Sequence, residues 1–229
     1  MISNTHIVLS ACNGSQFISE QIQSIRDQTF RDWRLWIRDD GSTDDTFSVL
    51  EEVATSDPRI FLYPRDGRQL GASGGFSWLL ERLPDDATQV FCCDADDVWL
   101  PEKMEQSRVA LLKAEAMESG PVLVHTDLRV TDSKLQTIDQ SLWHYLEMSP
   151  EPVTLQRLLV ENVATGPTIL MNRDLLEKAC PIPDNVPYQD WWITLVAAAF
   201  GRVVALPKAT VLYRRHSANL TGEYSKGRG

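Results

Sequence analysis

Short apolar runs alternate with amphipathic segments through the first half of the chain. Residues 6–11 form a mostly apolar run that ends at the turn-forming Cys12-Asn13-Gly14, a pattern typical of a buried strand. Beyond Ser15, three isoleucines recur at helical spacing with polar residues between them, which predicts an amphipathic helix. The same unit repeats downstream. It predicts strands at residues 33–38, 60–63 and 89–93, and helices at residues 43–54, 72–83 and 101–118.

The alternation becomes less regular after Gly120, and residues 140–152 carry no clear signal. Strands alternating with helices favour an α/β fold in which helices cover both faces of a mostly parallel sheet. Right-handed crossovers then bring the carboxyl ends of the strands to one edge. In this second half we expect strands at residues 122–126, 128–131, 168–171, 203–206 and 210–214, and helices at residues 155–160 and 190–200.

The composition supports a globular protein and excludes several classes. The chain has 229 residues, of which 43% are hydrophobic and 24% charged, enough for one well-packed domain. Its net charge of −10 has the wrong sign for gripping phosphate backbones, so we expect no nucleic-acid partner. A local basic patch would still allow peripheral contact with a membrane, so that partner stays open.

The sequence shows no targeting or disulfide signal. No run of about 18 apolar residues occurs, and the first residues lack the basic and apolar regions of a signal peptide. We therefore expect a cytoplasmic location, with the inner face of the membrane as an open extension. The four cysteines show no Cys-x-x-Cys spacing, and Cys92 and Cys93 lie inside an apolar run, which favours reduced thiols in the core.

Two acidic clusters follow predicted strands. Asp39 and Asp40 follow the second strand, and Asp94, Asp96 and Asp97 follow the fourth. Ligands of open α/β sheets bind at the carboxyl ends of the strands, so both clusters should face one crevice. Crowded carboxylates repel, and they need a cation, an arginine or hydrogen-bond donors nearby. The alternatives are a capped turn for the first cluster and a polar loop for the second.

Four motifs in this order resemble family 2 glycosyltransferases of the GT-A fold. Asp39-Asp40-Gly41-Ser42 and Asp94-Ala95-Asp96-Asp97 are followed by Gln189-Asp190-Trp191-Trp192 and by Tyr213-Arg214-Arg215-His216. The resemblance covers residues 5–222, and its details are most similar to bacterial rhamnosyltransferase-like enzymes of O-antigen and other surface polysaccharides. It implies one GT-A domain at residues 1–222, with a nucleotide-sugar-binding half (1–98), an acceptor-binding half (99–222) and a loose tail (223–229).

The resemblance assigns the first cluster to the nucleotide. Asp39 and Asp40 are expected to contact the base and the ribose of a nucleotide sugar. Atoms near Ser10 and Ala11, at the end of the first strand, are expected to line the base.

The second cluster is implied to serve the diphosphate and the sugar. Asp94 is expected near the ribose and Asp97 beside the sugar, whereas Asp96 and His216 are expected to bind a divalent metal, Mn²⁺ or Mg²⁺. A nucleoside diphosphate leaves easily only when its developing charge is neutralised. Oxygen ligands suit either cation, and an imidazole ligand tilts the choice toward Mn²⁺.

The resemblance makes Asp190 the general base. It would accept the proton of the acceptor hydroxyl while that oxygen attacks the anomeric carbon from the face opposite the nucleotide, which inverts the configuration. The alternative is an acidic residue at a helix N-terminus, where the helix dipole favours it. The residues expected on the acceptor side are Trp99, Thr165, Gly166, Trp191 and Trp192.

The donor is expected to be dTDP-rhamnose, with a UDP-sugar as the alternative, and the acceptor a glycan or a lipid-linked glycan. The chain could be one domain of a larger enzyme. Two other classes stay open: a haloacid-dehalogenase-like phosphatase, because Asp94-Ala95-Asp96 after an apolar strand resembles its nucleophile motif, and a non-catalytic nucleotide-sugar-binding module.

Overall fold

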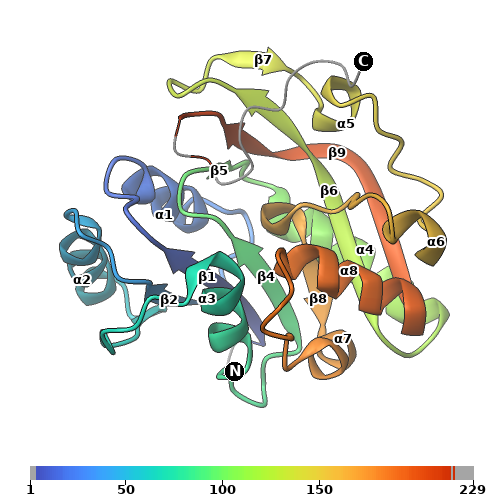
Figure 1. Ribbon diagram of the computed structural model, residues 1–229, viewed down its shortest axis with the longest axis horizontal. Coiled ribbons are helices and arrows are strands. Elements are labelled where there is room, and N and C mark those ends of the chain that lie inside the picture. Colours follow the sequence, from blue (N-terminus) through green and yellow to red (C-terminus); the bar gives the residue numbers. More distant parts are fainter. Residues whose placement is uncertain (1–3, 218, 220–229) are drawn as a thin grey trace.

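A computed structural model describes residues 4–217 and 219, and in it the chain is built around one curled nine-stranded sheet (Figure 1). The strands follow the order β3-β2-β1-β4-β8-β6-β9-β5, and β7 pairs with β6. The strands are β1 (Thr5–Ala11), β2 (Arg34–Asp39), β3 (Ile60–Leu62), β4 (Gln89–Cys93), β5 (Val98–Trp99), β6 (Val122–Thr131), β7 (Thr137–Asp139), β8 (Leu170–Asn172) and β9 (Arg202–Arg214).

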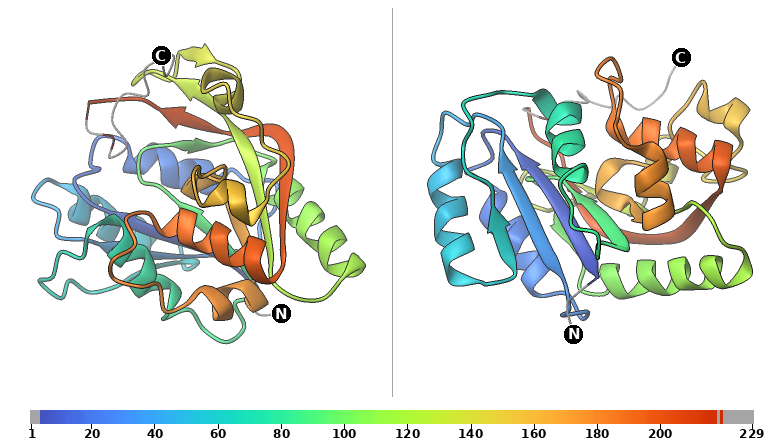
Figure 2. Two further views of the ribbon diagram at one scale, coloured as in Figure 1. Left: turned by 45° about the vertical axis from the view of Figure 1, so that its right-hand side comes forward. Right: turned by 90° about the horizontal axis from the view of Figure 1, so that it is seen from below.

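Helices cover both faces of the sheet, as the alternating pattern predicted (Figure 2). One core cluster joins the sheet to α1, α2 and α4, and a second joins its other face to α3, α7 and α8. The helices are α1 (Ile18–Arg26), α2 (Thr46–Ser56), α3 (Gly71–Leu80), α4 (Lys103–Met117), α5 (Leu142–Tyr145), α6 (Leu155–Leu158), α7 (Arg173–Ala179) and α8 (Gln189–Phe200), with a 3₁₀ turn η1 (Gly166–Thr168).

The first half of the sheet is parallel and confirms the expected strand-helix alternation. β1 lies between β2 and β4 and pairs in parallel with both, while β3 extends the sheet beyond β2. Every residue of β4 is buried, as a continuous apolar run indicates for a central strand. The carboxyl ends of β1, β2 and β4 therefore meet at one edge of the molecule.

The second half departs from the expectation in its strand order and lengths. β8 is inserted between β4 and β6 and runs antiparallel to both, so the sheet is mixed. β6 and β9 are each continuous where two short strands were expected, because their pairing tolerates register shifts at residues 126–128. Periodicity missed the short elements α5, α7, β5 and β7, which are fixed by contacts distant in sequence. The expected tail at residues 223–229 lies outside the described residues.

Helix α2 begins three residues later than predicted, because the residues before it hold a neighbouring loop. Asn13 N donates to Ser42 Oγ (2.9 Å), and Thr43 N donates to Asn13 Oδ1 (2.8 Å). Gly14 N donates to Thr46 Oγ1 (2.8 Å). Gly41 adopts a φ of +81°, which glycine tolerates readily. The loops after β1 and β2 are thus joined into one rigid unit.

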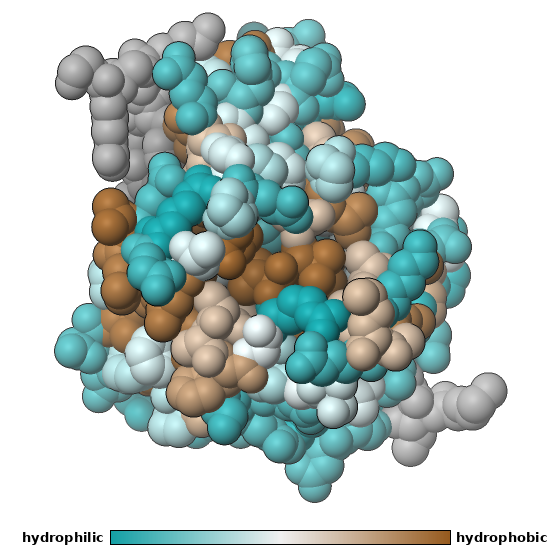
Figure 3. Space-filling model, turned by 90° about the vertical axis from the view of Figure 1, so that its right-hand side faces the viewer, coloured by the Kyte–Doolittle hydropathy of each residue, from teal (hydrophilic) through white to brown (hydrophobic). Residues whose placement is uncertain are grey.

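No helix among residues 4–217 and 219 is both long and apolar enough to cross a membrane. Hydrophobic residues nevertheless gather on the face that lies at the right of Figure 1 (Figure 3). α6 lies on this side in Figure 1, and exposed apolar side chains belong to it or follow it: Leu155 is 38% exposed, Leu159 69% and Val160 81%.

Candidate active site

The ends of β1 and β2 bring the expected nucleotide-binding residues together. Ala11 lies opposite Asp39 in the strand register, and Asp40 N donates to the Ala11 carbonyl (2.7 Å). Ser10 packs under α3 at Gly75, where an added Cβ would lie 2.1 Å from Ser10 Oγ. Ser10, Ala11 and both acids therefore share one edge, and Gly75 has a packing role there.

Asp39 has one oxygen held by the protein and one that is not. Its Oδ2 accepts hydrogen bonds from Arg65 Nε (2.9 Å) and Ser42 N (3.3 Å). Arg65 also lies over the Phe47 ring, 4.3 Å from its centroid, and its side chain is 42% exposed. In the described part of the chain, the buried Oδ1 of Asp39 has no hydrogen-bond partner. This atom is suited to accept an N–H group of a ligand.

Asp40 is placed differently, because both of its oxygens are occupied. Oδ1 accepts from Leu70 N (2.8 Å) and Arg38 Nε (3.3 Å), and Oδ2 accepts from Gly71 N (2.8 Å). Arg38 continues to Asp66 through two further hydrogen bonds (3.0 and 3.1 Å). Asp40 thus holds the start of α3 against β2, a supporting role that the sequence did not indicate.

The loop after β4 meets the end of β9. His216 Nε2 lies 2.9 Å from Asp96 Oδ2, and Asn219 Nδ2 lies 3.4 Å from the same oxygen. The Asp96 side chain is 26% exposed and that of His216 is 14% exposed. The structure therefore brings the two expected metal ligands together although they are 120 residues apart in sequence.

Arg214 and Asp97 hold the loop after β4 against the end of β9. Arg214 N donates to Asp97 Oδ1 (3.1 Å), and Arg214 Nε donates to the Asp96 carbonyl (2.8 Å). The Arg214 guanidinium also pairs with Glu20 and lies 4.5 Å from the Phe17 ring centroid. Asp97 is fully buried, and burial together with Asp96 and Asp94 raises its pKa. Arg214 thus has a structural role and is not exposed to a ligand.

Asp190 is the second residue of α8, and its side chain contacts the 3₁₀ turn η1. Its Oδ2 accepts from Gly166 N (2.9 Å) and its Oδ1 from Trp191 N (2.6 Å). Burial raises the pKa of Asp190 to about 6, although these backbone N–H groups lower it. The carboxylate is therefore held in place and has a basicity suited to proton transfer near neutral pH.

Asp94 and Asp190 approach the same glycine. A Cβ on Gly166 would lie 3.9 Å from Asp94 Oδ1 and 3.9 Å from Asp190 Oδ2. Gln189 lies beside them, and its Oε1 accepts from Ser73 Oγ of α3 (3.2 Å). Burial, Asp96 and Asp190 raise the pKa of Asp94 to about 8. The two carboxyl groups form one site that joins the two halves of the sheet.

The expected acceptor-side residues divide into two groups. Gly166 and the half-buried Thr165 lie at the turn beside Asp190. Trp191 and Trp192 are half-buried, and their ring nitrogens donate to the carbonyls of α6 and α7 (2.5 and 2.9 Å). Trp99 is 2% exposed and packs in the core, so the structure does not bring its ring to the cleft.

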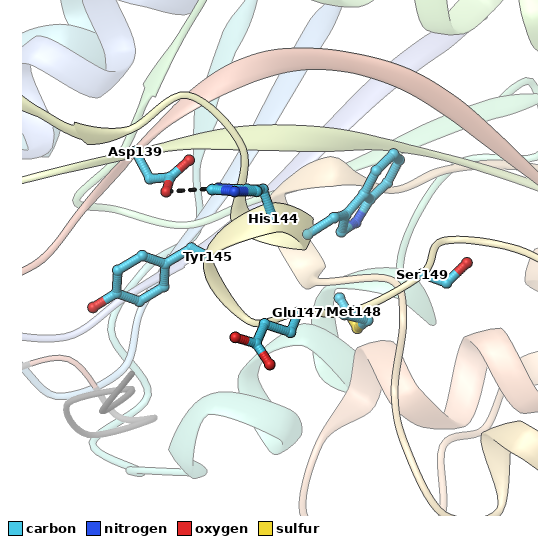
Figure 4. A pocket seen from close by; sticks show the side chains of 7 residues that line it. Asp139, His144, Tyr145, Glu147, Met148 and Ser149 are labelled. Atoms are coloured by element: carbon cyan, nitrogen blue, oxygen red, sulfur yellow. Dashed lines mark hydrogen bonds and ion pairs between the residues drawn. The ribbon is translucent and has the colours of Figure 1, made fainter. Parts of the chain in front are cut away.

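A separate hollow of about 490 Å³ lies at α5 in the second half (Figure 4). His144 Nδ1 lies 3.0 Å from Asp139 Oδ2 on its wall. The hollow is linked to the His216 segment because Arg215 Nη1 donates to the Tyr145 hydroxyl (2.7 Å). Its lining residues are Asp139, Trp143, His144, Tyr145, Glu147, Met148 and Ser149.

The side chains at this edge supply only part of the coordination shell of a cation. Among the described residues, no three His, Cys, Asp or Glu side chains form a metal site. Asp96 and His216 supply one carboxylate oxygen and one imidazole nitrogen, a pair that suits Mn²⁺ or Mg²⁺ when phosphate oxygens and water complete the shell. The arrangement fits a cation that binds together with a diphosphate.

Sequence reasoning missed two contributors to this edge. Arg65 pairs with Asp39, and its signal was a basic residue in the glycine-rich segment that follows β3. Ser73 bridges α3 to Gln189, and nothing in its local sequence marks that role.

Comparison with known proteins identifies what the chain is similar to. The sequence model of the family "Glycosyl transferase family 2" matches residues 6–179. An uncharacterized glycosyltransferase of Nostoc sp. is 28% identical over 222 residues, covering 93% of this chain and 65% of that protein. The dTDP-rhamnosyl transferase RfbG of Shigella flexneri is 26% identical over 222 residues, covering 93% and 73%.

A solved structure shares the fold. S. aureus TarS 1–349 in complex with UDP superimposes with a TM-score of 0.69 at 18% identity, covering 93% of this chain and 61% of that one. The likeness confirms the GT-A fold expected from the motifs. The chain thus spans about two thirds of the length of the Nostoc relative and somewhat less of the TarS chain.

Proposed function

Because this chain belongs to glycosyl transferase family 2, we propose that it transfers a sugar from a nucleotide diphosphate donor to a glycan acceptor. Membership of this family removes the phosphatase alternative. The non-catalytic binding module differs from our proposal in one measurable respect, since it would bind a nucleotide sugar without turning it over.

One observation carries the proposal. A free oxygen of Asp39, the Asp96–His216 pair and the Asp190 carboxylate lie along a single edge, and they come from four segments distant in sequence. Transfer from a nucleotide sugar requires, in this spatial order, a group that recognises the nucleobase, positive charge that neutralises the diphosphate, and a general base that deprotonates the acceptor hydroxyl. The three groups match these needs.

At the nucleotide end, Asp39 Oδ1 accepts an N–H group of the base while Arg65 keeps its other oxygen in place. Ser10 and Ala11 line this end. Asp40 supports the loop before α3, and Asp94 lies between the nucleotide and the acceptor site.

Asp96 and His216 are the residues that would hold a divalent cation, with Mn²⁺ favoured over Mg²⁺ because of the imidazole. When bound, the cation offsets negative charge on the departing nucleoside diphosphate. Asp97 fixes the loop that carries Asp96. Because Asp97 is fully buried, it supports this loop from the core instead of lying beside the sugar as the motif led us to expect.

At the acceptor end, Asp190 Oδ2 takes the proton of the attacking hydroxyl. Gly166 N keeps that oxygen oriented, and the missing side chain of the glycine leaves room for about one carbon atom, 3.9 Å from Asp190 Oδ2 and 3.9 Å from Asp94 Oδ1. The hydroxyl attacks the anomeric carbon from the face opposite the nucleotide, so one displacement inverts the configuration at that carbon. Thr165, Trp191 and Trp192 border the same space.

We propose dTDP-rhamnose as the donor and a bacterial surface polysaccharide or its lipid-linked precursor as the acceptor. The rhamnosyl relative RfbG supports the donor choice, and the UDP bound to TarS supports the alternative, a UDP-sugar. Peripheral contact with a membrane belongs to the same proposal. The exposed apolar residues at α6 are the positions at which substitutions would test this membrane contact.

The experiment is calorimetric titration of the protein with dTDP, UDP and GDP, each with and without Mn²⁺. We expect one nucleotide to bind much more tightly with the metal, and that nucleotide names the donor class. Incubation with the corresponding sugar donor and acceptor should then release the nucleoside diphosphate. Binding of none of the three would contradict the proposal, and binding without turnover would favour the binding module.

A further inference from the structure

The hollow at α5 is separate from the residues that we assign to the nucleotide and the metal. Its volume of about 490 Å³ is within the usual range of small-molecule sites. The aromatic rings of Trp143 and Tyr145 line it together with the carboxylates of Asp139 and Glu147. A sugar ring presents apolar C–H faces and hydroxyl donors, which aromatic rings and carboxylate oxygens complement. The lining therefore has the chemistry of a carbohydrate site.

Hydrogen bonds from the sheet hold the wall of this hollow in place. Asp127 Oδ1 accepts from Leu142 N (3.0 Å) and Trp143 N (3.4 Å), in the first turn of α5. Ser141 Oγ caps the same helix by accepting from His144 N (3.0 Å). Asp127 belongs to β6 and is 6% exposed, so α5 is fixed to the sheet from within. The hollow is thus formed before any ligand binds, as is usual for small-molecule sites.

Helix α5 ends at a position where a glutamate is unusual. Met148 N donates to the Trp143 carbonyl (2.8 Å) and Glu147 N to the His144 carbonyl (3.1 Å), which are the two hydrogen bonds of a Schellman motif. Glu147 takes the left-handed position of this motif with a φ of +54°, a position that favours glycine. Its carboxylate forms no hydrogen bond or ion pair with residues 4–217 and 219. A strained residue therefore brings an unpaired carboxylate to the hollow.

The other charged groups of the lining favour a neutral ligand. Asp139 is occupied within the protein, because its Oδ1 accepts from Ser141 N (3.1 Å) and its Oδ2 lies 3.0 Å from His144 Nδ1. Among the described lining residues, His144 is the one basic side chain, and it is 80% exposed. Two carboxylates repel a phosphate group. The lining thus suits the hydroxyl groups of a sugar and not the diphosphate of a lipid-linked acceptor.

The hollow adjoins the segment that carries His216. The Tyr145 hydroxyl accepts from Arg215 Nη1 (2.7 Å), and Arg215 N donates to the Thr131 carbonyl of β6 (2.9 Å). Arg215 directly precedes His216. The lining residues all lie between 139 and 149, beside β6 and β7, whereas the expected nucleotide contacts come from β1 and β2 in the other half of the sheet. This placement favours the acceptor over the nucleotide as the ligand.

We propose that the hollow at α5 binds a sugar residue of the acceptor glycan: the Glu147 carboxylate accepts hydrogen bonds from the sugar hydroxyls, and the apolar face of the sugar packs on the aromatic lining. The inference rests on the proposed function for the identity of the ligand as an acceptor. Binding of a sugar in the hollow is a separate property and needs no turnover. If Glu147 served only the turn, its replacement by glycine would change stability and nothing else.

The test is a titration of the protein with simple glycosides, followed through the indole N–H signal of Trp143 in NMR spectra. The probes are methyl α-L-rhamnoside, methyl β-D-glucoside and methyl N-acetyl-β-D-glucosaminide, and inorganic pyrophosphate is the anionic comparison. The Trp143 signal is assigned as the one that disappears in Trp143→Phe. We expect at least one glycoside to shift this signal saturably and pyrophosphate to leave it unchanged.

The affinity for the glycoside that binds best is then compared between the wild type and two variants of Glu147. Glu147→Gln removes the charge, and Glu147→Gly removes the side chain and relieves the left-handed backbone. We expect both to weaken binding by about tenfold, as loss of a hydrogen bond to a charged group does. The thermal midpoint of Glu147→Gly should equal or exceed that of the wild type. Glu52→Gln, at an exposed position of α2, is the matched control and should bind like the wild type.

The inference would be overturned if no glycoside shifts the Trp143 signal, if pyrophosphate alone shifts it, or if both Glu147 variants keep the glycoside affinity of the wild type. Glycoside binding by a protein that binds none of dTDP, UDP and GDP would instead support the sugar site and contradict the proposed function. Nucleotide binding without any glycoside in the hollow would do the reverse. The two failures are therefore distinguishable.

Discussion

The two acidic clusters at the edge of the sheet are built alike but compensated differently. In each, we assign one carboxylate to the ligand, and its neighbour holds the scaffold: Asp39 beside Asp40, and Asp96 beside Asp97. The cluster after β2 is neutralised by Arg38 and Arg65, which form ion pairs with it. The cluster after β4 has only His216 as an ion-pair partner among the described residues.

The difference shows where positive charge is still needed. Carboxylates that already have guanidinium partners can recognise a neutral base through a free oxygen. Three carboxyl groups without such partners repel one another, and the raised pKa of Asp94, about 8, reflects that repulsion as well as burial. We therefore expect the first cluster to read the nucleotide and the second to attract a cation.

The largest effect should come from Asp190, which lies beside the uncompensated cluster. Asp190→Asn keeps the shape and removes the basic oxygen, so we expect turnover to fall by roughly 10²–10⁴-fold. Nucleotide affinity with Mn²⁺ should change less than twofold, because the role of this group begins with proton transfer. Steady-state turnover and calorimetric binding measure the two quantities, and near-normal turnover would remove Asp190 from the mechanism.

The pH profile of turnover should sharpen the same assignment. Asp190 accepts a proton only when ionised, and burial raises its pKa to about 6. Turnover should therefore be nearly constant above pH 7 and fall towards a tenfold loss per pH unit well below pH 6. Saturating donor and acceptor are used so that kcat is followed. A profile that is flat from pH 7 to pH 4.5 would contradict the prediction.

A methyl group between the two carboxylates should have an intermediate effect. In Gly166→Ala the new Cβ would meet its neighbours at 3.7–3.9 Å, which is ordinary contact, so we expect the fold to be kept. The same methyl narrows the space proposed for the acceptor hydroxyl. We expect kcat/KM for the acceptor to fall by about tenfold at unchanged donor affinity. An equal loss of donor affinity would place Gly166 at the nucleotide instead.

The smallest effect on activity, with a clear effect on stability, should come from Asp40. Asp40→Ala leaves two backbone N–H groups and part of the Arg38 charge without an acceptor. We expect a loss of about 3 kcal/mol in unfolding free energy. The Tm should fall by roughly 6–12 °C. Asp39→Ala, which loses fewer protein contacts, is the matched control in a thermal unfolding experiment. A larger Tm loss for Asp39→Ala would reverse the roles of the pair.

The sequence predicted the parts of this fold that periodicity and motifs encode. The alternation of β1 to β4 with helices placed Asp39 and Asp96 at strand ends before any contact was known. It could not show that Asp40 caps the loop at Leu70, because that contact depends on a glycine-rich segment without periodicity. The insertion of β8 between β4 and β6, and the burial of Trp99 and Lys103, likewise follow from packing between distant segments.

One measurement tests directly how the roles are divided between the two acidic clusters. The affinity of the preferred nucleotide is titrated against Mn²⁺ concentration for Asp39→Asn and Asp96→Asn side by side. We predict that Asp39→Asn weakens binding equally at all Mn²⁺ concentrations, whereas Asp96→Asn removes the dependence on Mn²⁺ and leaves metal-free affinity unchanged. Equal Mn²⁺ dependence in the two variants would contradict the division.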